Sequence, residues 1–500
     1  MLFVRRVFAA LVLPCAVSAV SVNAEEAPET LWENTFGGSS DERGESVQQT
    51  SDGGFILLGL TESYGMGNDD FWLIKTDSDG NELWNKTFGG SGDDVGRSVQ
   101  QTSDGGFILL GESRANVFAK FDFWLIRTDS DGNELWNKNF GGSRHEFGYS
   151  VQQTSDDGFI LLGYADSGAG GYDFWLVRTD SAGNELWNKT FGGSVSDYGI
   201  SVQQTSDGGF ILVGSTDSYG AGRSDVWLIR TDGDGNERWN KTFGGSENDH
   251  GRSVQQTSGD GFILAGWTKS YGAGDEDSWL IRTDGDGNEL WNKTFGGSDS
   301  DTGYSVQPTS DGGFILLGST KSYGAGNDDF WLIRTDGDGN ELWNKTFGGS
   351  GEDDGKFVQQ TSDGGFVLLG ETGSYGAGDE DLWLIRTEGD GPPPCDLEVA
   401  LSNYPESAVP GGTLAFRVDA TNGCDDPLTF DRAVMNITGP ASLEKLLYDD
   451  EPFTVVGSVG KDLSLGVSPG APLGTYTVEV TISRDGEAID ADAFEVDVTG

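Results

Sequence analysis

Basic residues are scarce in this chain of 500 residues. Its 31 lysines and arginines stand against 82 aspartates and glutamates, and the formal net charge is −51 at pH 7. A surface of this charge repels nucleic acid and anionic lipid, so neither is an expected partner. Such acidity suits either a salty environment, where self-repulsion is screened, or a protein that gathers divalent cations. Both interpretations stay open at this point.

Histidines are few, and the common catalytic motifs are missing. The two histidines are His145 and His250, and the repeat described below places them two units apart, too distant to share a metal ion. The sequence has no G-x-S-x-G elbow, no H-E-x-x-H pair and no phosphate-binding loop. Acidic residues are so frequent that no two of them stand out as general acid and base. No catalytic residue is therefore assigned.

Long apolar runs are missing beyond the N-terminus. Residues 1–24 carry two arginines, an apolar run from Val7 to Val20 and the sequence V-N-A before an acidic stretch, the pattern of a cleaved export signal. No second run approaches the length of a membrane span. The sequence predicts a protein that is secreted or held at the cell surface, without a transmembrane segment.

Cysteine is almost absent. Removal of the export signal leaves only Cys395 and Cys424. An even pair in an exported chain indicates a disulfide, which stabilises a small domain by about 3 to 4 kcal/mol when its geometry is relaxed. We therefore expect these two cysteines to be bonded to each other.

Repetition is what the chain has in abundance. Seven units of about 52 residues follow one another over residues 31–391, each close to L-W-N-K-T-F-G-G-S, S-V-Q-Q-T-S-D-G-G-F-I-L-L-G and D-F-W-L-I-R-T-D-S-D-G-N-E. Each unit holds four short β-rich runs separated by Gly/Asp turns. This length and texture are typical of propeller blades, not of helical solenoids or β-helices. The sequence predicts an all-β, seven-bladed β-propeller.

The order of the runs predicts how the ring closes. With S-V-Q-Q-T as the inner strand, F-I-L-L-G and F-W-L-I-R follow it, and L-W-N-K-T-F is the outer strand. Because the chain begins with an outer strand and ends after a third strand, we expect residues 31–36 to pair with residues 382–387. A two-residue Asp-Gly turn also places Arg127 opposite Trp136, and stacking of such pairs would add about 0.5 to 1 kcal/mol per blade.

The hairpin with tryptophan after a glycine turn resembles the repeat of pyrroloquinoline-quinone-type propellers. The full unit is similar to uncharacterised propeller arrays in secreted prokaryotic proteins, and the resemblance covers residues 31–391. It implies the fold. It does not extend to the quinone cofactor, because the chain lacks an adjacent cysteine pair and has seven units where the quinoprotein enzymes usually have eight. No organic cofactor is expected.

The texture changes after the repeats. Residues 392–395 form a proline-rich linker, P-P-P-C, and residues 396–500 show alternating short strands punctuated by Pro-Gly turns. This part resembles a small bacterial Ig-like β-sandwich. Such modules usually act as spacers or adhesive units.

Two positions of the repeat are acidic in all seven units. The first lies between one unit's outer strand and the next inner strand: Glu42, Asp94, Glu146, Asp197, Asp249, Asp301 and Asp353. The second precedes the second tryptophan: Asp70, Asp122, Asp173, Asp225, Asp277, Asp329 and Asp381. One interpretation makes them Ca²⁺ sites, with Asp94, Asp122, Asp249 and Asp277 as ligands and Ca²⁺ as the candidate cofactor. The other, favoured by the sevenfold repetition, is that each carboxylate accepts turn N–H groups and fixes its own loop.

One unit departs from the repeat. Where others read S-Y-G-A-G, residues 112–122 read E-S-R-A-N-V-F-A-K-F-D, and the next loop on the same predicted face is also basic and aromatic. The residues of this predicted patch are Arg114, Phe118, Lys120, Phe121, Arg144, His145, Phe147 and Tyr149. Aromatic rings stack on sugars, and arginine pairs with carboxylate or sulfate. The alternative is drift in one copy of a duplicated array.

The sequence therefore favours a binding or scaffolding role of adhesion type. The expected ligand is a glycan, an anionic ligand or a protein, bound on the loop face by a monomer. Two alternatives stay open: an extracellular carbohydrate-active hydrolase or lyase, and a Ca²⁺-dependent structural surface protein.

Overall fold

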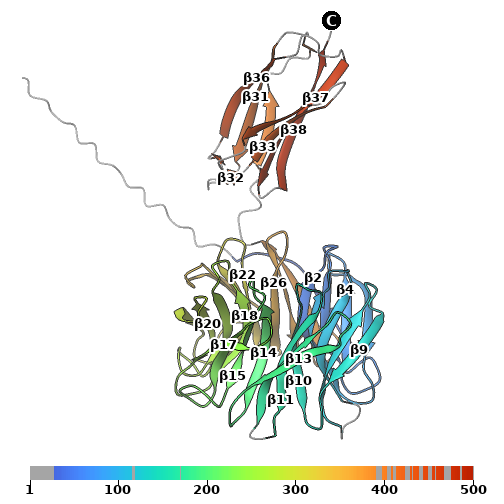
Figure 1. Ribbon diagram of the computed structural model, residues 1–500, viewed down its shortest axis with the longest axis vertical. Helices are drawn as coiled ribbons and strands as arrows, with labels where there is room; N and C mark the ends of the chain where they lie inside the picture. The colour runs from blue at the N-terminus through green and yellow to red at the C-terminus, as the bar shows by residue number, and fades with distance from the viewer. Residues whose placement is uncertain are drawn as a thin grey trace, which may run out of the picture. The chain divides into compact units, whose positions relative to one another are not determined.

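The computed structural model describes residues 27–114, 119–168 and 171–389 and, beyond these, only the strands between Leu397 and Val498. The chain divides into two compact units, residues 1–390 and 391–500. The first is a seven-bladed β-propeller, whose strands β1 to β28 form seven four-stranded antiparallel sheets (Figure 1). The predicted fold class is confirmed for this unit.

The blades are numbered 1 to 7 along the chain, and each contributes one strand to each of four layers. The inner strands are β2 (Glu42–Gln49), β6 (Asp94–Gln101), β10 (Glu146–Gln153), β14 (Asp197–Gln204), β18 (Asp249–Gln256), β22 (Asp301–Pro308) and β26 (Asp353–Gln360). The second strands are β3 (Phe55–Thr61), β7 (Phe107–Ser113), β11 (Phe159–Asp166), β15 (Phe210–Thr216), β19 (Phe262–Thr268), β23 (Phe314–Thr320) and β27 (Gly365–Thr372). The third strands are β4 (Asp70–Thr76), β8 (Asp122–Thr128), β12 (Tyr172–Thr179), β16 (Asp225–Thr231), β20 (Asp277–Thr283), β24 (Asp329–Thr335) and β28 (Asp381–Gly389). The outer strands are β5 (Glu82–Phe88), β9 (Glu134–Phe140), β13 (Glu185–Phe191), β17 (Glu237–Phe243), β21 (Glu289–Phe295), β25 (Glu341–Phe347) and, for blade 7, β1 (Thr30–Phe36).

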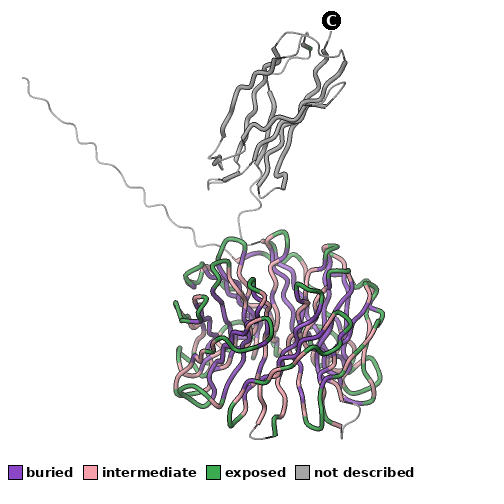
Figure 2. The backbone as a smooth tube through the Cα atoms, in the orientation of Figure 1, coloured by how far each residue is buried: buried purple, intermediate pink, exposed green. Residues whose placement is uncertain are grey.

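The hydrophobic core lies between the blades. All residues of β3 and β4 are buried, whereas β5 alternates between exposed and half-buried residues, so burial falls from the middle strands outward (Figure 2). The middle strands are covered on both faces, which is why they read as continuous F-I-L-L and F-W-L-I runs. Each core cluster joins two neighbours: Leu58 and Phe71 of blade 1 pack with Val99 and Ile126 of blade 2.

The ring closes as predicted. Strand β1 pairs antiparallel with β28, with Trp32 opposite Arg386 and Phe36 opposite Leu382. Phe36 joins a core cluster with Leu57 and Trp72 of blade 1. The N-terminal strand therefore completes the last blade and also seals its contact with the first.

Glutamines of the inner strands tie each blade to the next. The side-chain oxygen of Gln48 accepts the N–H of Gln101 at 2.6 Å, and Gln359 of blade 7 accepts the N–H of Gln49 of blade 1 at 2.6 Å. Equivalent bonds run from blade 2 to 3, 3 to 4, 4 to 5 and 6 to 7. These bonds satisfy N–H groups on the channel side of the innermost strand, which has no further strand to pair with.

The hairpin between the third and outer strands has the predicted register but a longer turn. Arg127 lies opposite Trp136, with a bulge between Arg127 and Thr128. Residues 129–133 form the turn, in which the Asp129 carboxylate accepts the N–H groups of Asp131 at 3.0 Å and Asn133 at 2.8 Å. Gly132 takes a positive φ of 74° there, a conformation that favours glycine.

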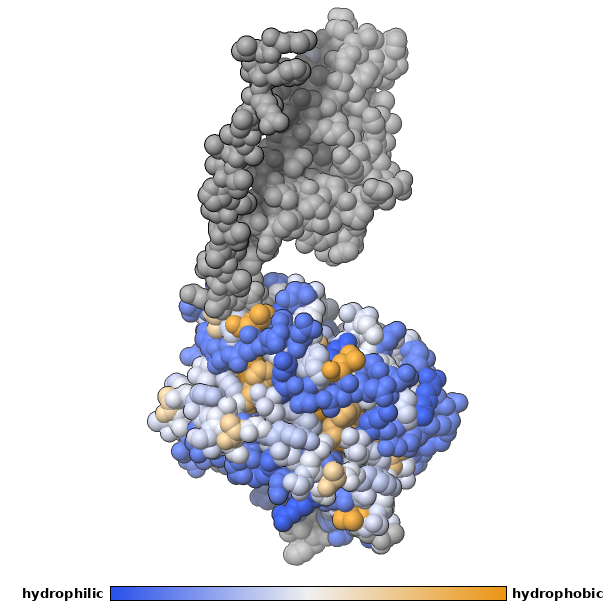
Figure 3. All heavy atoms as spheres, turned by 90° about the vertical axis from the view of Figure 1, so that its left-hand side faces the viewer, coloured by the Kyte–Doolittle hydropathy of each residue, from blue (hydrophilic) through white to orange (hydrophobic). Residues whose placement is uncertain are grey.

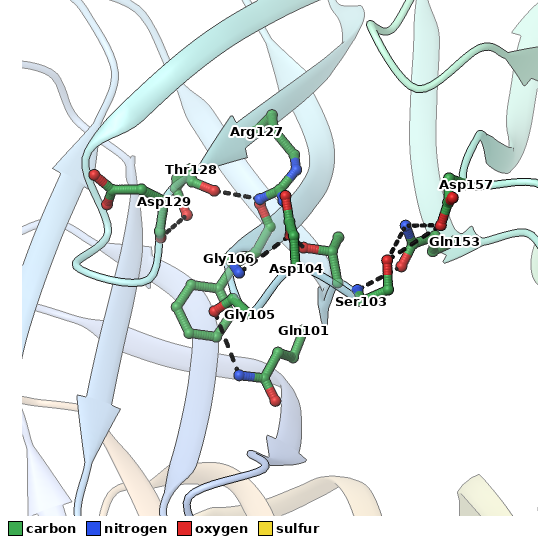
Figure 4. Close-up of polar contacts among 12 residues, drawn as sticks. Gln101, Ser103, Asp104, Gly105, Gly106, Arg127, Thr128, Asp129, Gln153 and Asp157 are labelled. Atoms are coloured by element: carbon green, nitrogen blue, oxygen red, sulfur yellow. Dashed lines mark hydrogen bonds and ion pairs between the residues drawn. The ribbon is translucent and has the colours of Figure 1, made fainter.

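The arginine of this hairpin acts as a clamp. Arg127 donates to the carbonyl oxygens of Phe107, at 3.0 Å, and Thr128, and it forms an ion pair with Asp104 of the neighbouring turn (Figure 4). Arg178, Arg230, Arg334 and Arg386 make the same kind of ion pair in their blades. Among the described residues, none of these five guanidinium groups lies over its opposing tryptophan ring. The predicted stacking was therefore wrong, because the buried guanidinium is held by the carbonyls and the carboxylate.

The second unit is described through its strands. They are β29 (Leu397–Ser402), β30 (Ser407–Ala408), β31 (Thr413–Asn422), β32 (Leu428–Phe430), β33 (Arg432–Thr438), β34 (Leu443–Tyr448), β35 (Phe453–Val455), β36 (Ser458–Gly466), β37 (Gly474–Arg484) and β38 (Glu487–Val498). They form a three-stranded, a five-stranded and a two-stranded sheet. An Ig-like domain stays a prediction here. The export signal, the 392–395 linker, Cys395 and Cys424 lie outside the described residues.

We expect deletion of residues 31–36 to make the propeller aggregate or lose its cooperative unfolding. The deletion exposes the edge of β28 and removes Phe36 from the core. Thermal melting and size-exclusion chromatography measure this. Leu31→Ser, at a position 51% exposed on the same strand, is the control and should change stability by less than about 0.5 kcal/mol. A monomeric deletion variant with the wild-type Tm would contradict closure by β1.

Candidate functional site

The two ends of the propeller differ in how strictly the repeat is kept. One end, called the loop face here, carries the loops that connect blades and the loops between second and third strands. The two sets of loops lie together, because the N–H of Ser63, in a loop of the second set, donates to Glu42, at the end of a connecting loop, at 2.9 Å. The other end carries the D-G-G and D-G-N turns, which are nearly identical in all seven units. Variation between repeats often marks the binding surface of a repeat protein, so the loop face is the candidate binding surface.

The repeated carboxylates of the loop face hold loops. Asp277 accepts the N–H groups of Ala273 at 3.0 Å and Gly274 at 3.1 Å. Asp249 accepts the N–H of Gly245 at 2.8 Å and the hydroxyl of Ser270 at 2.7 Å. Twelve of the fourteen are buried, Asp122 and Asp173 being half-buried. The bonds match the loop-fixing interpretation.

The residues predicted as Ca²⁺ ligands are not gathered into one cluster. Asp94 and Asp249 begin the inner strands of blades 2 and 5, and Asp122 and Asp277 begin third strands. Within the described part of the chain, no group of three or more His, Cys, Asp or Glu side chains is placed to hold a metal ion. Calcium binding at these positions stays a prediction.

One carboxyl group on this face has a strongly raised pKa. Burial, and then the nearby carboxylate of Asp122, raise the pKa of Glu146 to about 7, against an ordinary value of 4.5. The pKa of Asp122 is raised as well, chiefly by burial. Because two nearby carboxyl groups do not both ionise easily, protonation of Glu146 is favoured as the pH falls below 7.

The predicted basic and aromatic patch is brought together, but its two arginines are already paired with carboxylates. Arg114 forms an ion pair with Asp93 and lies 4.8 Å above the Phe121 ring. Arg144 binds Asp166 at 3.0 Å. Phe118 lies outside the described residues. Because these charges are neutralised by neighbours, they add little attraction for an anionic ligand.

His145 is a hydrogen-bonding partner within the same patch. Its Nε2 lies 3.1 Å from Lys120 Nζ, and its Nδ1 accepts the N–H of Phe121 at 3.3 Å. Burial and the charge of Lys120 lower the pKa of His145, which favours the neutral ring. A neutral imidazole has one acceptor nitrogen, so only one of the two bonds forms at a time.

The aromatic part of the patch is larger than the sequence suggested. Its rings are Phe121, His145, Phe147, Tyr149, Tyr164, Tyr172 and Tyr198, called the aromatic cluster here; adjacent ring centroids lie 5.1 to 5.9 Å apart. All seven are half-buried. The cluster runs from the loop of blade 2 across blade 3 to blade 4. It is an apolar stretch on a propeller whose visible side in Figure 3 is mostly hydrophilic.

Sequence reasoning missed Tyr164, Tyr172 and Tyr198. A signal existed, because Tyr164 stands at a position that varies from blade to blade: Leu60, Glu112, Tyr164, Ser215, Trp267, Ser319 and Glu371. The residue opposite it on the inner strand varies as well: Arg43, Val95, Phe147, Tyr198, His250, Thr302 and Asp354. In a repeat that is otherwise nearly constant, these positions mark the surface that differs between blades.

A third variable position lines the mouth of the central channel. It is occupied by Glu45, Arg97, Tyr149, Ile200, Arg252, Tyr304 and Lys356, called the collar here, which surround a cavity of about 290 Å³. Tyr149 belongs to both the collar and the aromatic cluster. The cluster therefore leads from the edge of blade 2 to the channel mouth.

Comparisons with known proteins assign neither a family nor a function. No protein-family model and no curated protein sequence matches this chain. Similar solved structures include the WD40 domain of Pan2 from Neurospora crassa, with a TM-score of 0.43 and 9% identity over 69% of this chain and 89% of that one. Sqt1 from Chaetomium thermophilum has a TM-score of 0.41 and 11% identity over 69% and 82%. An ancestral GH74 enzyme has a TM-score of 0.41 and 10% identity, and the match covers 94% of this chain and 64% of that enzyme. At these values the similarities carry no argument about activity.

The described residues contain no helix that is long and apolar enough to cross a membrane.

We expect Asp277→Ala to lower the free energy of unfolding by about 1 to 3 kcal/mol, because two loop N–H groups lose their acceptor. Urea unfolding measures this. Asp286→Ala, at an exposed position of the opposite turn, is the matched control and should be near neutral. Repeating both measurements with millimolar Ca²⁺ and with a chelator tests the metal interpretation: stabilisation by Ca²⁺ that Asp277→Ala abolishes would favour a calcium site.

Glu146 predicts a specific pH dependence. Its pKa in the folded protein is about 7 against an ordinary 4.5, so between these values the folded state retains a proton that the unfolded state has lost. Its contribution to stability therefore falls as pH rises through this window. Glu146→Gln removes that contribution, so the Tm of the variant should gain on the wild type as pH rises from 5 to 8. A Tm difference that stays constant would contradict the raised pKa.

Proposed function

We propose that this protein is a secreted or cell-surface binding protein of adhesion type, whose propeller holds a glycan on its loop face. The observation that supports this most directly is the aromatic cluster beside the channel mouth. It is confined to blades 2 to 4, although the other blades share the same backbone. Structural demands are alike in every blade, so they do not explain why seven rings join into one cluster across these three blades, whereas blade 5 carries a single stacked pair, His250 and Trp267, at the corresponding positions.

The chemistry of the cluster suits a sugar. Half-buried tyrosine rings offer an apolar face for stacking and a hydroxyl for hydrogen bonding. The basic side chains beside it are engaged with Asp93 and Asp166, so the cluster is not primarily an anion site. A protein partner would make use of the same aromatic anchors and is the alternative ligand that an absence of glycan binding would favour.

The second unit fits this role as a spacer. We propose that residues 396–500 form an Ig-like domain, stapled by a disulfide between Cys395 and Cys424, and that residues 1–24 direct export. The acidic surface of the propeller, with its net charge of −51 for the whole chain, keeps such a protein soluble and away from nucleic acid.

A glycan array probed with the purified protein tests the proposal, followed by analysis of the bound polysaccharides for products. We expect binding without cleavage. New reducing ends or unsaturated products would support a hydrolase or lyase instead, and the absence of any glycan binding would overturn the proposal.

Tyr172→Ala should weaken binding of the best array ligand at least tenfold, or about 1.4 kcal/mol, because this ring contacts Phe147, Tyr164 and Tyr198 at the centre of the cluster. The matched control is Tyr323→Ala, an exposed tyrosine in the regular loop of blade 6 whose ring packs on Trp331. The control should bind like the wild type. Equal losses in both variants would contradict a site at the cluster.

A further inference from the structure

The collar is one of the variable positions of an otherwise uniform repeat, and it surrounds a cavity of about 290 Å³. Its seven residues belong to five residue types. Directly below it, the same cavity is lined by a ring of serines in six blades, with Phe357 in place of the seventh: Ser46, Ser98, Ser150, Ser201, Ser253 and Ser305. The cavity is therefore lined by hydroxyl groups beneath a mixed collar of aromatic and charged side chains.

Most charges of the collar are neutralised by neighbours. Arg97 contacts Glu45 at 2.5 Å and Glu112 at 2.9 Å. Lys356 lies 3.5 Å from both Asp354 and Glu371. These contacts neutralise Arg97 and Lys356, so these two collar residues add little net positive charge to the cavity.

Arg252 is different. Among the described residues no carboxylate forms an ion pair with it, and its buried Nε has no hydrogen-bond partner. Its guanidinium lies 5.6 Å from the ring centre of Tyr304, and Lys356 contacts that ring from the other neighbouring blade at 4.7 Å. The adjacent His250 stacks on Trp267 and supplies no negative charge to pair with Arg252. Burial lowers the pKa of His250 to about 4, so its ring is neutral and adds no second positive charge at pH 7. Of the two arginines of the collar, Arg252 is the one without an ion pair among the described residues.

The geometry points to a subsite for a single acidic sugar at the channel mouth, with the carboxylate of a hexuronate on Arg252 and its ring between Tyr304 and the serine hydroxyls. This inference rests on the proposed function, because it places the end of the bound glycan next to the aromatic cluster through Tyr149. A cavity of about 290 Å³ has room for one sugar ring and not for a folded chain segment.

The lining distinguishes a sugar from an acidic peptide. The hydroxyls of Ser46, Ser98, Ser253 and Ser305 each accept an N–H from the next blade, at 3.2 to 3.3 Å. None of these four donates a hydrogen bond in the described contacts, so each keeps its own hydrogen for a ligand oxygen. Several donors around one small cavity match a ring that carries several oxygens. Arginine suits the carboxylate, which it binds through two parallel N–H donors.

Methyl glucuronide and methyl glucoside are the probes, because they differ only in the carboxylate. Titrations by calorimetry or ligand-observed NMR should show at least tenfold tighter binding of the glucuronide to the wild-type protein. Arg252→Gln should reduce that preference to less than threefold while leaving the weak binding of the glucoside unchanged. Arg238→Gln, an exposed arginine of strand β17 that pairs with Asp207, is the control and should keep the full preference. Thermal melting checks that both variants are folded.

If Arg252→Gln does not fold, Arg252→Lys serves as the second variant; it keeps the charge but loses the paired N–H donors, and it should lower the preference at least threefold. Retention of the full preference in the folded variant would overturn the inference. Binding of neutral array glycans but not of the glucuronide by the wild-type protein would also overturn the inference, and it would still support the proposed function. Equal binding of N-acetylglutamate amide and the glucuronide would also overturn it, in favour of an acidic peptide. Failure to bind any glycan would overturn both.

Discussion

The burial of each blade against its two neighbours is the constraint on which the rest of this structure depends. The second and third strands are apolar on both faces, so no blade covers its own core. Stability then requires a closed ring, and strand β1 closes it by completing blade 7. The glutamine bonds between inner strands reinforce the same arrangement, and the arginine clamps fix the turns within their own blades.

This constraint separates two kinds of position. Residues packed between blades and residues in the tight turns meet the same packing and backbone requirements in every unit, which explains why they are nearly identical in the seven copies. Residues on the channel side of the inner strand and at the loop-face end of the second strand lie outside the apolar core between blades, and they contact one another in different combinations, such as Arg97 with Glu45 and Tyr164 with Tyr198. The collar and the aromatic cluster are built from these positions. A uniform scaffold thus presents a surface without sevenfold symmetry, and only such a surface can hold one ligand in one orientation.

The acidic residues show why residue type alone does not identify a site. Asp249 and Asp277 have the composition expected of calcium ligands, yet their oxygens accept bonds from their own loops. The cations of the predicted patch are likewise engaged, Arg114 with Asp93 and Arg144 with Asp166. Nothing in the sequence singles out Arg252. In the structure it is the arginine at the channel mouth that has no ion pair among the described residues.

The sequence by itself determined the all-β class, the seven blades, the four strands of each blade and the closing partner of the N-terminal strand. These follow from a local periodicity and from turn residues, which act over a few neighbours along the chain. It also indicated part of the patch, through the departure at residues 112–122. Only the tertiary structure decided that Phe121, Tyr164 and Tyr198 share one surface, that arginines clamp turns in place of stacking on tryptophan, and which charges are neutralised. The contacts of the aromatic cluster join residues from different blades, and the arginine clamps join separate turns of one blade. Their distances depend on how the folded strands and blades are aligned.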